Sequence, residues 1–303
     1  MVQANRIKTV ALVGPTAVGK SETALNLAEI FNGEIVGADS MQIYRGFDIG
    51  TGKLPIYERR GIAHYMIDVC DGDCDFSVGE YVKKSSQVIF DIHSRGKLPI
   101  IVGGTGMYVY SLLSGCDFGS APKNEGVRAQ LKSAAHFFGG TTIHKLLTFV
   151  DKASADKISV SDVKRNIRAL EIFALTGKPK SKAAGYSSPP YDALTIVLTL
   201  PREILYERIN KRVKKMFDDG LIDETASLMQ YKDCGSMQAL GYKQIASNPD
   251  SPREELEPLV AQKTRNYSKR QMTYFKNMNL NKKFIDVRDT DKVISTVKEF
   301  LER

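Results

Sequence analysis

The chain has 303 residues, of which 42% are hydrophobic and 26% are charged, and its formal net charge is +8. This balance is typical of a globular protein with one large or two ordinary domains, and its apolar runs are too short to cross a bilayer. We find no signal-peptide core, expect a cytosolic protein without a membrane segment, and expect the basic excess to favour a polyanionic partner.

The first third of the chain alternates between short apolar runs and helical periodicity. In chain order we predict a strand at Thr9–Val13, a helix at Glu22–Phe31, a strand at Glu34–Ala38, a helix at Val78–Ser94 and a strand at Leu98–Val102. Strands that alternate with helices indicate an α/β fold, with a parallel sheet covered by helices on both faces.

The middle of the chain, from about Phe118 to Pro190, loses the strand signals and gains Ser, Lys, Gly and Ala. Helical patterns occupy Glu125–Phe138 and Val163–Leu175, and Ser187–Pro190 is typical of a linker. We therefore predict a small helical domain, residues 118–190, inserted into the α/β core.

The last third of the chain returns to the core. The β-rich run Ala193–Leu200 predicts that the sheet resumes, and one further strand is predicted at Phe284–Val287 among helices. The predicted core therefore consists of residues 1–117 and 191–303.

A glycine-rich motif follows the first predicted strand and precedes a helix, which is the context of a P-loop. Its residues are Gly14, Pro15, Thr16, Ala17, Val18, Gly19, Lys20 and Ser21. Glycines let successive N–H groups face a phosphate, and the helix N-terminus adds a partial positive charge. Lys20 supplies a full charge, and the Ser21 hydroxyl could hold Mg²⁺. The motif predicts binding of a phosphate-bearing substrate.

Two polar residues are predicted at the carboxyl ends of strands, where open α/β sheets place ligands. Asp39 follows the second strand, while the most apolar strand ends in Gly103, Gly104 and Thr105 without an acid. A motor-type ATPase, which needs such an acid, is therefore disfavoured. Asp39 could be a general base or a metal partner, and the Thr105 hydroxyl could donate a hydrogen bond to a phosphate oxygen. The alternatives are a helix N-cap for Asp39 and a turn residue for Thr105.

Basic residues gather in three segments. Arg208, Lys211, Arg212 and Lys215 form one helical stripe. The segment Lys263–Lys283, which we predict to be helical, has seven basic residues, no acid, and Tyr267, Tyr274 and Phe275 interleaved. A third cluster is Lys164, Arg165 and Arg168. Any one of these could be a solvated helix face, but together they indicate a surface that binds a polyanion, and basic residues interleaved with aromatics suit RNA.

The four cysteines do not indicate a metal centre. Cys70, Cys74, Cys116 and Cys234 lack the spacing of zinc ligands, so we expect reduced thiols.

A set of motifs runs along most of the chain. They are GPTAVGKS at Gly14–Ser21, ADSMQIYRGFDIGTGK at Ala38–Lys53, HYMID at His64–Asp68, VGGTGMYV at Val102–Val109, VKRNIRALEIFALTGKP at Val163–Pro179, ALGYKQ at Ala239–Gln244 and TRNYSKRQMTYFKN at Thr264–Asn277. With this set in this order, the chain resembles the tRNA dimethylallyltransferase family, the bacterial tRNA isopentenyltransferases.

The resemblance implies a reaction and its partners. A dimethylallyl group would pass from dimethylallyl diphosphate to N6 of the adenosine 3′ to the tRNA anticodon, with Mg²⁺ present and pyrophosphate released. Asp39 would be the general base near N6, Thr105 would contact the diphosphate close to the breaking bond, and the glycine-rich motif would hold the diphosphate. Arg208 or Arg212 would reach the diphosphate from the other side, and the sequence leaves open which.

The resemblance also implies tRNA contacts. Besides Asp39 and Thr105, these would come from Ser40, Met41 and Gln42 at the target nucleotide; Arg128, Lys164, Arg165, Asn166, Ile167 and Arg168 at the anticodon arm; and Gln238, Ala239, Leu240, Gly241, Tyr242 and Lys243. A monomer is expected.

Three other functions are weighed against this one. An isopentenyltransferase acting on free adenine nucleotides would need neither the inserted unit nor the basic C-terminal segment. A P-loop small-molecule kinase using ATP would predict an acidic metal ligand and leaves ALGYKQ unexplained. An RNA-binding module with a vestigial loop would have no use for Lys20, Ser21, Asp39 and Thr105 together.

Overall fold

The computed structural model describes residues 6–115, 124–183 and 189–303. The chain divides into a core unit, residues 1–113 with 189–303, and a helical unit, residues 114–188. Cys116 and Phe118, and Ser187 and Ser188 of the predicted linker, lie outside the described residues.

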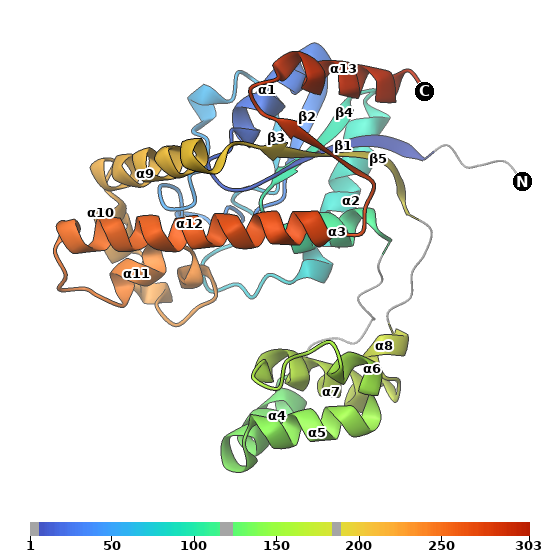
Figure 1. Cartoon of the computed structure of the whole chain (residues 1–303), viewed down its shortest axis with the longest axis vertical. Coiled ribbons are helices and arrows are strands. Elements are labelled where there is room, and N and C mark those ends of the chain that lie inside the picture. The colour runs from blue at the N-terminus through green and yellow to red at the C-terminus, as the bar shows by residue number, and fades with distance from the viewer. Residues whose placement is uncertain (1–5, 116–123, 184–188) are drawn as a thin grey trace, which may run out of the picture. The chain divides into compact units, whose positions relative to one another are not determined.

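The core unit contains one sheet of six parallel strands in the order β3-β2-β4-β1-β5-β6 (Figure 1). The strands are β1 Ile7–Val13, β2 Gly33–Gly37, β3 His64–Tyr65, β4 Leu98–Gly103, β5 Tyr191–Thr199 and β6 Lys282–Asp286. The predicted α/β class with a parallel sheet is confirmed. Only β3 was missed, because two half-buried residues carry no periodicity.

Helices connect these strands in the core unit. They are α1 Lys20–Ile30, α2 Val78–Ser94, α3 Gly106–Leu113, α9 Arg202–Asp218, α10 Leu221–Ser227, α11 Tyr242–Ala246, α12 Arg253–Asn277 and α13 Thr290–Leu301, with 3₁₀ turns η1 Ile56–Glu58, η2 Met229–Tyr231 and η3 Ser236–Gln238. In the described part of the chain no helix is long and apolar enough to span a membrane.

One detail of the sequence prediction is wrong. The basic segment Lys263–Lys283 is not one helix, since α12 ends at Asn277 and both Lys282 and Lys283 belong to β6. These two lysines pair with Thr195 and Ile196 of β5, so backbone hydrogen bonds at the edge of the sheet prevail over helical propensity there.

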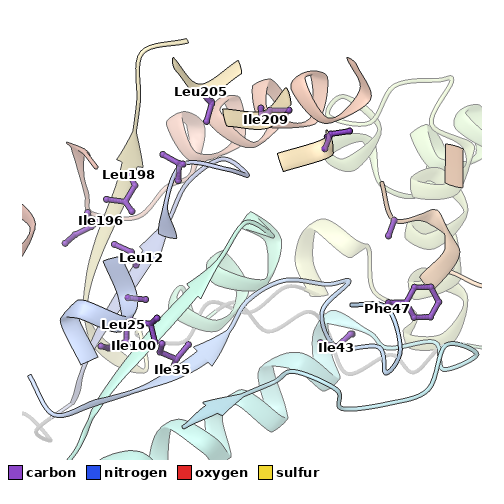
Figure 2. Close-up of a cluster of buried hydrophobic side chains, with 14 of the residues drawn as sticks. Leu12, Leu25, Ile35, Ile43, Phe47, Ile100, Ile196, Leu198, Leu205 and Ile209 are labelled. Atoms are coloured by element: carbon purple, nitrogen blue, oxygen red, sulfur yellow. The ribbon is translucent and has the colours of Figure 1, made fainter. Parts of the chain in front are cut away.

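Strand residues alternate between two buried faces, as the side-chain period of two requires. Val10 and Leu12 of β1 belong to one apolar cluster, with α1, α9 and α13, whereas Ala11 and Val13 belong to another, with α2, α3 and the end of α12. Figure 2 shows the first cluster, in which Leu12 and Leu25 lie on one side of the sheet. Helices therefore cover both faces.

The connections from β1 and β4 leave the sheet in opposite directions. These strands are neighbours, with Val13 paired to Gly103, but β1 leads to α1 on one face and β4 to α3 on the other. Such a switch point opens a crevice at the strand carboxyl ends, where ligands bind in α/β sheets. The glycine-rich loop, residues 14–21, and the segment after β4 lie there.

The helical unit has its own small core. Its helices are α4 Glu125–Phe138, α5 Gly140–Val150, α6 Lys152–Ala155, α7 Val163–Thr176 and α8 Lys180–Ala183. Ile143 and Leu147 of α5 pack with Ile167 and Leu170 of α7. The predictions of α4 and α7 are confirmed, while α5 was missed.

Candidate active site

The glycine-rich loop surrounds the side chain that carries its charge. The Lys20 Nζ donates hydrogen bonds to the carbonyl oxygens of Gly14 (3.1 Å) and Pro15 (2.8 Å). Burial lowers the Lys20 pKa from 10.5 to about 8, and the nearby Asp39 carboxylate opposes this change. A cation held partly out of water in this way is stabilised by any anion that enters beside it.

The loop forms one side of a cavity of about 410 Å³, which we call the loop cavity. Lys20, Arg208 and Arg212 bring three positive charges to its wall, and Ser21 and Asp39 also line it. Such a wall suits a phosphate group better than an apolar ligand.

A second cavity of about 300 Å³, the side cavity, lies next to the first. Its lining is more apolar, with Met41, Val213, Met216, Leu240 and Val260, and it also includes Ser40 and Arg270. It can therefore hold a flat or apolar group.

The two cavities have a common wall. The residues that line both are Thr16, Asp39, Thr51, Arg212 and Tyr267. A carboxylate and a guanidinium thus stand where the cavities meet.

The two groups of this wall have defined partners. An Asp39 carboxylate oxygen, Oδ1, accepts a hydrogen bond from the Met41 N–H (2.9 Å). Burial lowers the pKa of Arg212, and the charge of Asp39 opposes that effect. The Met41 N–H therefore holds the Asp39 carboxylate in the common wall, where its charge acts on Arg212.

The two candidate arginines differ in position. The exposed Arg208 donates through Nη1 to the Val18 carbonyl (3.1 Å) and lines only the loop cavity. The half-buried Arg212 donates through Nη2 to the Thr51 carbonyl (3.4 Å) and lines both cavities. Gly52 permits this approach, because a Cβ there would lie 1.8 Å from Arg212 Nη2 and its φ is +61°.

Thr105 is not among the residues that line either cavity. Its Oγ1 accepts a hydrogen bond from the Ser40 N–H (2.9 Å) and donates to Ser40 Oγ (3.2 Å). Tyr267 is hydrogen-bonded to Thr105. Burial and the charge of Asp39 raise the pKa of Tyr267 to about 12, while its hydrogen bonds with Thr105 and Gln271 act in the opposite direction and lower it. Thr105 therefore supports the residues of the wall from behind.

Other predicted residues fall into three positions. Ser40, Met41 and Gln238–Leu240, from two distant motifs, meet at the side cavity, whereas Gln42 lines the loop cavity. Gly241 and Tyr242 are buried and Lys243 is exposed.

The buried Tyr242 stabilises a neighbouring loop through hydrogen bonds. Its hydroxyl donates to Glu224 and accepts from the Gly50 N–H (3.0 Å), and Glu224 Oε1 also accepts from the Ile49 N–H (3.0 Å). These bonds hold the loop that presents Gly50 and Thr51 to the cavities.

The basic cluster of the helical unit is largely engaged within that unit. Arg128 and Arg168 both bind the fully buried Glu171 carboxylate, at 3.0 Å and 2.8 Å. The amide Nδ2 of the buried Asn166 donates to the Ser159 carbonyl (2.9 Å), and its Oδ1 lies 2.9 Å from His144 Nδ1.

The predicted tRNA contacts of Asn166 and Ile167 therefore do not agree with their position, since both side chains are buried and complete the fold of α7. Lys164 and Arg165 are exposed.

Several residues of the site were not predicted from the sequence. Tyr267 and Gln271 of α12 and Thr51 line the loop cavity, and Arg270 lines the side cavity. The spacing of four between Tyr267 and Gln271, which places them on one helix face, was the available signal.

Protein side chains alone do not form a metal centre in residues 6–115, 124–183 and 189–303, where no group of three His, Cys, Asp or Glu residues could hold an ion. In the same ranges Cys70, Cys74 and Cys234 are free thiols.

Comparisons with known proteins agree with the fold. A family model described as IPP transferase matches residues 42–278. The tRNA dimethylallyltransferase of Thermoanaerobacter sp. (strain X514) is 43% identical over 288 residues, covering 92% of this chain and 91% of the relative. That of Bacillus mycoides (strain KBAB4) is 42% identical over 309 residues, covering 100% and 96%.

Two solved structures are also similar. The full-length tRNA isopentenylpyrophosphate transferase from Bacillus halodurans has a TM-score of 0.72 and 37% identity, covering 97% of both chains. A eukaryotic dimethylallyltransferase acting on tRNA has a TM-score of 0.82 and 26% identity, covering 98% of this chain and 80% of the other.

Proposed function

The chain belongs to the IPP transferase family, and on this premise we propose that it transfers a dimethylallyl group from dimethylallyl diphosphate to N6 of the adenosine 3′ to the anticodon of tRNA. The observation that carries the proposal is the pair of adjoining cavities with Asp39 and Arg212 in their common wall. One cavity is suited to a diphosphate and the other to a base, so the reacting atoms would meet between them.

The diphosphate lies in the loop cavity. As the bond between the allylic carbon and the diphosphate oxygen breaks, negative charge builds on the leaving pyrophosphate. Lys20, Arg208 and Arg212 stabilise that charge, together with the N–H groups at the start of α1. Cations already in place before the reaction need no rearrangement as the charge develops.

Mg²⁺ fits this cavity as an ion held mainly by the diphosphate. Mg²⁺ takes oxygen ligands, keeps several waters and needs few protein groups, and the exposed Ser21 hydroxyl lines the cavity at the first turn of α1. Bound there, the ion would neutralise charge on the leaving group. The Ser21 hydroxyl would be its ligand from the protein.

The target adenine enters the side cavity. A base must leave its stack to reach such a pocket, and bases of an anticodon loop leave most easily. Its exocyclic amine attacks the allylic carbon, and the Asp39 carboxylate accepts the N6 proton as the new bond forms. Met41 and Leu240 supply apolar surface for the base. Thr105 acts through Ser40, to which it is hydrogen-bonded.

Each of the two units also carries exposed cations that suit a polyanion. Lys243 in the core unit and Lys164 and Arg165 in the helical unit are exposed and would bind tRNA phosphates. One chain supplies both cavities, which supports an active monomer, and a tRNA substrate implies that the enzyme works in the cytoplasm.

The test is a transfer assay with radiolabelled dimethylallyl diphosphate and Mg²⁺. We expect label in a tRNA that has adenosine 3′ to the anticodon, and none in the same tRNA with guanosine at that position. Equal labelling of free AMP would favour a mononucleotide isopentenyltransferase. Transfer of phosphate from ATP to a small molecule, without labelled tRNA, would favour a kinase.

A further inference from the structure

Gln271 of α12 connects two loops that are far away in sequence. Its Oε1 accepts a hydrogen bond from the Thr16 N–H (2.8 Å), and its Nε2 donates to the Gly104 carbonyl (3.0 Å). The residue is 6% exposed. Since an N–H can only donate and a carbonyl can only accept, both partners fix the same orientation of the amide.

These two bonds complete a series that crosses the whole site. Gln271 joins the glycine-rich loop after β1 to Gly104 after β4. The next residue, Thr105, binds the Ser40 N–H and hydroxyl, and Ser40 follows Asp39 after β2. The order of the strands is β2-β4-β1, so each link joins the ends of neighbouring strands.

The spacing of these loops matters for the proposed reaction, on which this inference rests. The donor is held by the glycine-rich loop and the proton acceptor is Asp39, so the reacting carbon and nitrogen lie between them. A misplacement of about 1 Å can lower a rate about 100-fold. We propose that Gln271 is a positioning residue, which fixes the distance between the bound diphosphate and Asp39 by joining the Thr16 and Gly104 backbones.

A substitution at Gly104 can break this link while Gln271 itself remains unchanged. A Cβ at Gly104 would lie 2.3 Å from Gln271 Nε2, while its next neighbours would be at 3.5 Å and 3.8 Å. The backbone of Gly104 is not left-handed, so alanine brings no φ strain. The amide at the end of the Gln271 side chain would swing aside, and the link would open while the fold stays intact.

The experiment is a double-mutant cycle with Gln271→Ala, Gly104→Ala and the pair. Two quantities are measured: kcat for tRNA labelling, and the Kd of dimethylallyl diphosphate without tRNA by calorimetry. Gln262→Ala, an exposed glutamine on the same helix, is the control. Circular dichroism and thermal melting establish that each variant is folded.

We expect each single substitution to lower kcat about 10- to 100-fold and to change the donor Kd less than about threefold, because Lys20 and the arginines remain. Once Gln271 is truncated, adding Gly104→Ala should lower kcat less than about twofold further, since both substitutions break one link. Gln262→Ala should behave as the wild type.

Three results would overturn the inference: unchanged kcat in the folded variants, additive effects in the pair, or a loss of donor affinity as large as the loss of kcat. The last would make Gln271 a diphosphate ligand. If Gln271→Ala does not fold, the kcat and the donor Kd of Gly104→Ala alone test the positioning role of Gln271. A wild-type protein that fails to label tRNA would refute the proposed function itself, whereas normal wild-type labelling with unaffected variants refutes only the positioning role.

Discussion

Raising the pH from 7 to 9 should weaken binding of the allylic diphosphate through a single side chain. In the protein without ligand, burial lowers the pKa of Lys20 to about 8, from the 10.5 of an ordinary lysine. The side chain therefore changes from mostly charged at pH 7 to mostly neutral at pH 9. Since the charged form binds the diphosphate, the Kd should rise about tenfold over this range.

The same shift predicts a change in stability with a definite sign. The folded pKa lies below the unfolded value, so charged Lys20 lowers the free energy of unfolding at pH values below 8, and this loss fades as pH rises towards 10.5. The difference corresponds to about 3 kcal/mol. Lys20→Met removes this destabilisation by the buried charge, but the variant also loses two hydrogen bonds to loop carbonyls, each of which contributes about 1 kcal/mol. We expect the ligand-free variant to be about 1 kcal/mol more stable than the wild type.

The assay is titration calorimetry with dimethylallyl diphosphate at pH 7, 8 and 9. The ligand's last phosphate pKa lies near 6, so its own charge stays constant over this range. Buffers of different ionisation enthalpy should reveal proton uptake on binding above pH 8, because the bound anion raises the Lys20 pKa. Lys20→Gln is the matched control, and its weaker binding should not vary with pH.

Two results would refute this reasoning. A constant wild-type Kd from pH 7 to 9 would mean that Lys20 remains charged throughout. An equal rise of Kd in Lys20→Gln would assign the pH dependence to another group.

Two further predictions concern the carboxylates of Asp39 and Glu34. Asp39→Asn keeps an acceptor for the Met41 N–H, so donor Kd at pH 7 should change less than about threefold while kcat falls about 10²- to 10⁴-fold; collapse of donor binding in calorimetry would instead make Asp39 a metal ligand. Glu34 is buried against Arg95 and Lys97, and these bonds lower its pKa to about 2. The ionised Glu34 stabilises the folded protein above about pH 4.5, and this contribution is lost as pH falls towards 2. Glu34→Gln should therefore lower the free energy of unfolding in urea by about 1–2 kcal/mol at pH 7. An equal loss at pH 3 would contradict this.

Much of the fold was predictable from local patterns. The strand before Gly14, the helix after Ser21 and the buried run at Leu98–Val102 each depend on neighbouring residues, whose periodicity and turn chemistry are visible in the sequence. Asp39 and the Gly103–Thr105 segment were predicted at one edge of the sheet because parallel strands bring their carboxyl ends together.

Other parts of the site depend on which distant segments become neighbours. Gln271 reaches Thr16 across 255 residues, and Glu224 reaches Ile49 across 175. No local pattern specifies such contacts. Ion pairs between distant residues cannot be predicted for the same reason. In the sequence Arg128 is a candidate RNA-binding residue, but in the structure it is paired with the buried Glu171.

The sequence by itself therefore determined every described strand except β3, the helices α1, α2, α4 and α7, the glycine-rich loop and the residue types that carry the proposed chemistry. The tertiary structure decided how they meet: Arg212 reaches both cavities while Arg208 reaches one, and Thr105 stands behind Ser40. The physical reason is that backbone conformation follows from nearby residues, whereas burial, charge pairing and the distance between two loops are set by the packing of the whole sheet.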